Sequence, residues 1–280
     1  MPANQQNAAL FNPNALNLTR VATYERLIRA PEERVWENAL DWEHLPWLHK
    51  TSFGYIELDE AGEWGWRTWS NPEHTAHIEL TRGNDSCYVA RSYNADSQVS
   101  EFWTTVTADD GNTQIAVEFH FPEVVQQRSG SLHDAILKLY TQLWDEDEAM
   151  MIERHRRLVE TKELNREINL GTETAIYQKL SGSDPVIFQL ARREYQLREV
   201  IGELHAHTTI CPHLSGPLSH CVDQDGQLTC PWHGYRFDIQ SGECIFPKSA
   251  ACHLPPPPTI TIEQGDIIAR SSAQDARVTS

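Results

Sequence analysis

The stretch CPWHGYRFD (230–238) carries Cys230 and His233 three positions apart, followed by a glycine and two aromatic residues. A second stretch upstream, CPHLSGPLSHC (211–221), begins with a cysteine and a histidine two positions apart. Zinc fingers usually pair cysteine with cysteine and histidine with histidine, whereas each arm here offers one residue of each type. Two such arms can give one iron two thiolates and a second iron two imidazoles, so the spacing predicts a two-iron cluster.

The longer segments around these pairs, HAHTTICPHLSGPL (205–218) and CPWHGYRFDIQSGEC (230–244), closely resemble the two ligand boxes of the Rieske family. A zinc site and a set of unrelated cysteines are the alternative interpretations. The resemblance implies a [2Fe–2S] cluster with two thiolate and two imidazole ligands. The expected cluster ligands are Cys211, His213, Cys230 and His233.

The composition is that of a globular chain with a strongly acidic charge balance. Of its 280 residues, 40% are apolar, and the formal net charge is −17. Such a surface repels nucleic acid and anionic membranes, so we expect neither of them as a partner. An acidic surface either suits a basic protein partner or simply keeps the chain in solution.

The cysteine count and the N-terminal residues indicate a cellular location. Six cysteines are too few for a disulfide scaffold, and five of them fall in the last quarter of the chain, which points to a local metal site in a reducing compartment. The N-terminal stretch has no basic residue before Arg20 and no apolar block, unlike a signal peptide. No apolar run approaches the length of a membrane span. We therefore expect a soluble, cytoplasmic protein.

Hydrophobic patterning predicts an α+β domain followed by a strand-rich one. Residues 20–29 alternate like a strand, and 53–122 contain about six short alternating segments, which predicts an antiparallel meander. A long helix follows, ending near Glu160. A curved sheet wrapped on this helix would enclose a pocket, and the order of elements resembles the helix-grip fold of the START and polyketide-cyclase superfamily. The expected parts are a disordered tail at 1–17, a helix-grip catalytic domain at 18–162, an all-β Rieske domain at 163–270 and a tail at 271–280.

A second candidate metal site lies in WENALDWEHLPWLH (36–49). Asp41 and His44 are three residues apart and would share one face of a helix. His44 and His49 are five residues apart, which an ideal helix would splay by about 140°. We expect Pro46 to break or kink the helix so that both imidazoles meet at one point.

A carboxylate on the long helix is the expected third ligand. Asp147 alone interrupts an apolar helix face, and a buried carboxylate is costly unless a charge or a metal meets it. The alternative is a simple ion pair with Arg154. Non-haem Fe(II) sites use two histidines and one carboxylate, so we expect Asp147 to complete a triad with His44 and His49. The apolar face comprises Tyr140, Leu143, Trp144, Met151 and Leu158, and the acids Asp145, Glu146 and Glu148 are expected to point elsewhere.

This second constellation resembles the catalytic domain of Rieske non-haem iron oxygenases, which is itself a helix-grip domain with an aspartate ligand on its last helix. The resemblance implies that Asp41 is catalytic, linking an iron-ligand histidine to His233 of a neighbouring subunit in a homotrimer. The family places the Rieske domain before the catalytic domain, whereas here it comes last. The residues that match the family's signature are Glu37, Asn38, Asp41, His44 and His49.

The same resemblance implies an enzyme that takes O2 and electrons from an NAD(P)H-dependent reductase, with or without a ferredoxin. It would hydroxylate, dihydroxylate or dealkylate a small apolar or aromatic molecule at Fe(II). The alternative function is a Rieske electron-transfer or redox-sensing protein with a START-like ligand-binding domain and no oxygenase activity. Aromatic residues of the sheet would line the substrate pocket. The candidates for this role are Trp64, Trp66, Phe102, Phe119 and Phe121.

Overall fold

The computed structural model divides into two compact units, Met1–His155 (unit 1) and Arg156–Ser280 (unit 2). The predicted tail at 1–17 lies outside the described residues, and so does the tail at 271–280 apart from Ser271. Within the described part of the chain, no helix is long and apolar enough to cross a bilayer. The described residues are 18–95, 97–122, 132–160, 164–182, 185–200, 202–219 and 226–271.

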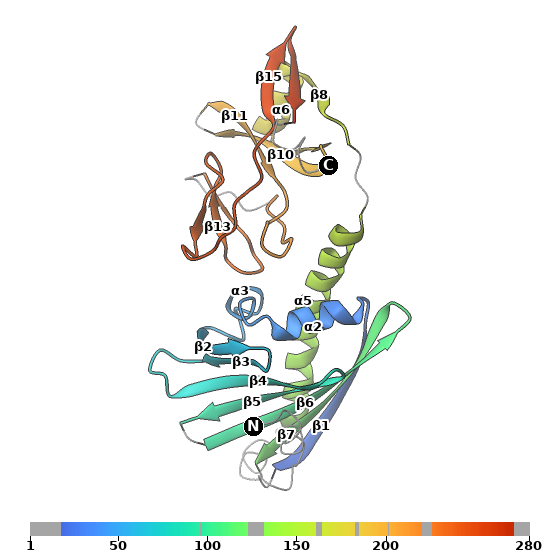
Figure 1. Cartoon of the computed structure of the whole chain (residues 1–280), viewed down its shortest axis with the longest axis vertical. Helices are drawn as coiled ribbons and strands as arrows, with labels where there is room; N and C mark the ends of the chain where they lie inside the picture. The colour runs from blue at the N-terminus through green and yellow to red at the C-terminus, as the bar shows by residue number, and fades with distance from the viewer. Residues whose placement is uncertain are drawn as a thin grey trace. The chain divides into compact units, whose positions relative to one another are not determined.

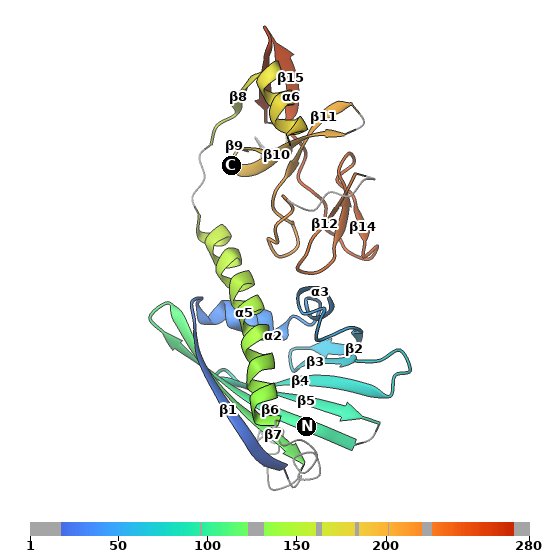
Figure 2. The same ribbon diagram turned by 180° about the vertical axis from the view of Figure 1, so that it is seen from behind.

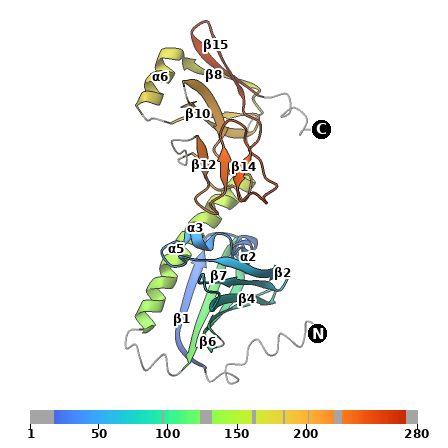
Figure 3. The same ribbon diagram turned by 90° about the vertical axis from the view of Figure 1, so that its left-hand side faces the viewer.

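Unit 1 contains a seven-stranded antiparallel sheet in the order β1-β7-β6-β5-β4-β3-β2. Strands β2 to β7 follow one another as neighbours, so the predicted antiparallel meander is confirmed. Strand β1 joins this meander by pairing with β7, which makes β1 and β2 the two edges of a strongly twisted sheet (Figures 1 and 3). The strands are β1 (Leu18–Ile28), β2 (Glu57–Gly62), β3 (Gly65–Trp69), β4 (Ala76–Asn84), β5 (Cys87–Asn94), β6 (Ser97–Asp109) and β7 (Asn112–Pro122).

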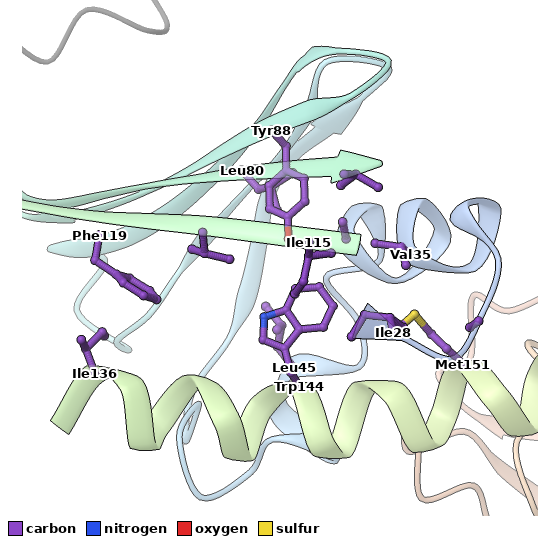
Figure 4. Packing of buried hydrophobic residues seen from close by; sticks show 14 of the residues in the cluster. Ile28, Val35, Leu45, Leu80, Tyr88, Ile115, Phe119, Ile136, Trp144 and Met151 are labelled. Atoms are coloured by element: carbon purple, nitrogen blue, oxygen red, sulfur yellow. The ribbon is translucent and has the colours of Figure 1, made fainter. Parts of the chain in front are cut away.

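The long helix α5 (Leu132–Val159) lies across one face of this sheet and carries the core of the unit (Figure 2). Ile136, Trp144 and Met151 point from α5 toward the strands, as Figure 4 shows. They recur at helical spacing, which is why one stripe of the helix is buried. Leu158, which we predicted to continue this stripe, is instead 52% exposed.

Two short helices precede the meander. Helix α2 (Glu32–Leu40) ends where Asp41 takes an extended conformation, and α3 (Leu45–Leu48) begins a few residues later. Pro46 lies in the first turn of α3, a position that tolerates proline because its missing N–H would have no helical partner there. Pro46 therefore does not kink one continuous helix. It starts a separate helical turn that has His44 at one end and His49 at the other.

The described residues of unit 2 form three small antiparallel sheets and one helix that follows α5. The sheet orders are β11-β10-β9, β12-β13-β14 and β15-β16-β8. The helix α6 (Glu173–Ser181) packs against the sheet that contains β8 (Figure 2), so the prediction of an all-β domain at 163–270 was wrong at this segment. The strands are β8 (Glu167–Thr172), β9 (Val186–Leu190), β10 (Arg193–Val200), β11 (Glu203–Thr208), β12 (Gln227–Thr229), β13 (Arg236–Asp238), β14 (Cys244–Phe246), β15 (Thr259–Glu263) and β16 (Asp266–Arg270).

Candidate metal centres and substrate cavity

Unit 1 brings two imidazoles and one carboxylate together at a buried point. One possible ligand atom from each of His44, His49 and Asp147 lies within 4.8 Å of the others. The Asp147 Oδ1 atom is 2.9 Å from His49 Nε2 and 3.5 Å from His44 Nε2. The two imidazole rings lie edge to face with centroids 5.2 Å apart. Two histidines and one carboxylate are the donor set of mononuclear non-haem Fe(II) sites, so these residues fit such an ion.

The remaining polar atoms of the three residues face further protein groups. The His44 Nδ1 atom is 3.6 Å from Asp41 Oδ2, and the His49 Nδ1 atom is 2.6 Å from Glu146 Oε2. The Asn38 amide donates a hydrogen bond of 2.9 Å to Asp147 Oδ1. Carboxylates on the outer nitrogen of a metal-binding histidine fix the tautomer and the ring orientation. Both Nε2 atoms are therefore directed toward Asp147.

Glu146 was missed by sequence reasoning, which placed it away from the site. It is one position before Asp147 on α5, about 100° around the helix. His49 lies at the end of α3, and its Nδ1 reaches Glu146 from the side. The sequence signal available was an acidic residue flanking a candidate ligand, which is too common to be informative alone.

The titration of these groups follows from their mutual contacts. Burial alone would lower the pKa of His49, but hydrogen bonds and charge interactions with Asp147 and Glu146 raise it above its usual value. Burial would raise the pKa of Asp147, but the His49 hydrogen bond, both imidazoles and the Asn38 amide lower it. The Asp147 carboxylate is therefore ionised near neutral pH, which is the form that binds a divalent cation.

The alternative partner considered for Asp147 is engaged elsewhere. Arg154 Nε donates to Glu37 Oε2 at 2.7 Å, and Arg34 Nη1 contacts the same oxygen at 2.6 Å. The next acid on the helix, Glu148, accepts hydrogen bonds from Arg26 and Arg29. Glu37 and Glu148 are thus paired with arginines, whereas Asp147 faces the two imidazoles and an amide.

The triad lies in the wall of a cavity of about 480 Å³ between the sheet and α5. Three of the predicted substrate-contact residues line it: Trp66, Phe102 and Phe121. Phe119 is fully buried in the core (Figure 4) and packs against Phe102, with ring centroids 5.0 Å apart, but it is not among the residues that line the cavity. Trp64 lies in the turn between β2 and β3, also away from the lining. Further lining residues that were not predicted to contact substrate include Leu45, Phe53, Ile78, Leu80, Tyr88 and Tyr140.

In unit 2, the two cysteine–histidine arms form loops of matching geometry. In the first loop, the Cys211 N–H donates to the Gly216 carbonyl at 2.8 Å, and the Cys211 carbonyl accepts from the Ser215 N–H at 3.0 Å. Cys230 makes the same two bonds to the residues five and four positions further on, at 2.8 and 2.9 Å. The residue four positions after each cysteine has a positive φ, 65° at Ser215 and 66° at Gly234. The two arms are therefore structural equivalents.

The two loops bring the two cysteine thiols together and the two histidine imidazoles together. Cys211 and Cys230 are 1% and 0% exposed, and their thiols hydrogen-bond, which holds the pKa of Cys230 below its usual value and that of Cys211 above it. The His213 and His233 rings lie edge to face with centroids 4.7 Å apart, and His213 stacks on Tyr235 at 4.2 Å. Two adjacent thiols beside two adjacent imidazoles fit the split ligand set of a Rieske cluster.

Comparisons with known proteins address mainly unit 2. Residues 165–257 match the family model of the Rieske [2Fe-2S] domain. The apoptosis-inducing factor 3 of Homo sapiens is 36% identical over 74 residues, which are 26% of this chain and 12% of that protein. The 4beta-methylsterol monooxygenase of Methylococcus capsulatus is 46% identical over 41 residues, which are 15% of this chain and 11% of that protein.

A third similar protein is the ferredoxin component of the alkene monooxygenase system of Xanthobacter autotrophicus. It is 30% identical over 84 residues, which are 29% of this chain and 66% of that protein. The chain thus spans only about an eighth of the length of the first two relatives.

Proposed function

Residues 165–257 are a Rieske [2Fe–2S] domain, and from this premise we propose that the chain is the oxygenase component of a Rieske-type system. The proposed reaction uses O2 and externally supplied electrons to hydroxylate, dihydroxylate or dealkylate a small apolar or aromatic molecule. The observation that carries the proposal is the triad of His44, His49 and Asp147 in the wall of an apolar cavity. Similarity to a monooxygenase and to the ferredoxin component of another supports an oxidoreductase role.

Each proposed centre has a distinct set of residues. Cys211, His213, Cys230 and His233 would hold the cluster, which would supply one-electron chemistry. The triad would hold a ferrous ion, which would supply the chemistry of O2. The contributions of unit 1 side chains are positional. Glu146 orients the His49 imidazole, Asn38 orients Asp147, and the Asp41 carboxylate lies 3.6 Å from His44 Nδ1. The apolar cavity wall binds the substrate beside the triad and limits the access of water.

The proposal extends to the fold of unit 1 and to partners. We assign residues 18–162 to a helix-grip catalytic domain, since a curved antiparallel sheet packs on a long final helix. The electron donor would be an NAD(P)H-dependent reductase, with or without a ferredoxin. We place the electron route between Asp41 and His233 of a neighbouring subunit in a homotrimer. Asp41 supports this role because its carboxylate is directed at the outer nitrogen of His44.

Iron analysis separates this proposal from an electron carrier that has a ligand-binding domain. The oxygenase requires about three irons per chain, two in the cluster and one in the triad, whereas the carrier requires about two. His44→Ala is expected to remove one iron and to leave the visible absorption of the cluster unchanged. An iron content of two in both proteins would contradict the proposal.

Turnover provides the second arm of the test. The chain is reduced without oxygen and then given isotopically labelled O2 together with a panel of aromatic and N-methyl compounds. We expect labelled product, or loss of the N-methyl group, from the wild type and neither from His44→Ala. Equal product from both proteins would show that the chemistry occurs elsewhere.

A further inference from the structure

The cavity of unit 1 runs beside α5, whose lining residues extend from Leu132 to Asp147. This segment measures about 22 Å along the helix axis, at 1.5 Å per residue. His44 and His49 lie at the Asp147 end. A substrate that reaches the triad therefore lies alongside α5, and side chains nearer Leu132 contact its far end.

Tyr140 is the hydroxyl-bearing residue on this stretch of the cavity wall. It lies seven residues before Asp147, two helical turns away on the same face of α5. Its ring packs edge to face against Phe102 and Phe119, with centroids 5.6 and 4.5 Å away. These contacts hold the ring in one orientation. The other lining residues of α5 between the two ends are Ala135, Ile136, Leu139, Leu143 and Trp144.

The Tyr140 hydroxyl has no hydrogen-bond partner among the residues that the structure describes. Burial raises its pKa well above the usual value, so the group stays protonated and can donate. Tyr140 is half-buried and is one of the residues that line the cavity. The hydroxyl is not sealed in the core, so an acceptor on a ligand in the cavity can take its hydrogen bond.

Tyr88 provides the contrast within the same cavity. Burial raises its pKa to about 12, but its hydroxyl is hydrogen-bonded to the side chain of Thr104. Its polar atom is thus already satisfied by the protein. Of the two serines that line the cavity, Ser52 is exposed to solvent and Ser92 is half-buried.

We propose that Tyr140 is a substrate-binding residue that donates a hydrogen bond to an uncharged acceptor oxygen on an otherwise apolar substrate. This inference rests on the proposed function and narrows its substrate class to neutral carbonyl, ether or hydroxyl compounds. No lysine or arginine occurs among the described lining residues, and Asp41 and Asp147 disfavour an anion. The acceptor and the carbon that reacts would be separated by about 10 Å, the axial distance between Tyr140 and Asp147.

The test compares the binding of acetylnaphthalene and ethylnaphthalene, which differ by a carbonyl in place of a methylene. Calorimetry is done on the full chain with an oxidised cluster and no reductant, so that no turnover occurs. In Tyr140→Phe, the ratio of the two dissociation constants should shift about fivefold against the ketone, the value of one neutral hydrogen bond. In Tyr88→Phe, the ratio should match that of the wild type.

Three results would overturn the assignment. They are an unchanged ratio in Tyr140→Phe, an equal shift in Tyr88→Phe, or a shift in Ser92→Ala alone. Failure of the wild type to bind either compound would also overturn it, because a cavity of this size holds a naphthalene. If the chain prefers the ketone through Tyr140 but forms no oxidised product, this inference stands and the oxygenase proposal fails. If it forms oxidised product without that preference for the ketone, the oxygenase proposal stands and this inference fails.

Discussion

Removing the Glu146 carboxylate should weaken metal binding at the triad, although Glu146 is not itself an expected metal ligand. Its Oε2 atom lies 2.6 Å from His49 Nδ1, and His49 is only 2% exposed. A charge-assisted hydrogen bond of this kind contributes about 1.5–3 kcal/mol. Each 1.4 kcal/mol is a factor of ten, so Glu146→Ala should weaken ferrous binding roughly 10- to 100-fold, the range found for partners of metal-binding histidines.

The assay is an anaerobic titration of ferrous iron into protein from which a ferrous chelator has removed the mononuclear iron. Asp145→Ala is the matched control, since it removes the same charge from the adjacent position of α5. Asp145 contacts Arg26 at 2.7 Å and makes no contact with the triad in the described structure. We expect the ferrous-iron affinity of Asp145→Ala to stay within about twofold of that of the wild type. Equal weakening in both variants, or none in Glu146→Ala, would refute the orienting role of Glu146.

Two further predictions concern the cluster loops and the stability of unit 1. Gly216→Ala would place a Cβ 2.5 Å from Cys230 Sγ, so we expect lower cluster content by visible absorption, with naphthalene binding to unit 1 unchanged. Glu148→Gln should destabilise unit 1 by about 3 kcal/mol in urea unfolding, because Glu148 is buried and paired with Arg26 and Arg29. Burial would raise the pKa of Glu148, but these arginines lower it. Because the pKa of Glu148 is lower in the folded state, its ionised carboxylate stabilises the fold at pH values above its unfolded-state pKa of about 4.3. The loss of unfolding free energy in Glu148→Gln should therefore be full at neutral pH and shrink as the pH falls below that value. A deficit that persists unchanged at acidic pH would contradict the ion-pair explanation.

The triad was predictable because its members leave separate local signals. Asp147 interrupts an apolar helical stripe, and His44 and His49 flank a proline on a short amphipathic segment. Their convergence depends on α3, which begins afresh after the extended Asp41. A proline alone predicts a break but not whether a kink or a new helix follows. The contact of Glu146 with His49 depends on that same tertiary detail.

Other errors have similarly local causes. Trp64 and Trp66 are two residues apart and would share one face of a strand, but β3 begins at Gly65 and leaves Trp64 in the turn. Helix α6 has a weak apolar stripe, with Ile176 as its buried residue. Its Thr172 cap, whose side chain accepts from the Ala175 N–H at 3.4 Å, was the signal available in the sequence.

The most direct test of the central claim is anomalous X-ray diffraction at the iron edge, on crystals of protein loaded anaerobically with ferrous iron. The account predicts density for a pair of irons between the Cys211 and Cys230 thiols and the His213 and His233 imidazoles. It also predicts one separate iron between His44, His49 and Asp147. Iron confined to the cysteine–histidine loops, with no anomalous density at the triad, would contradict it.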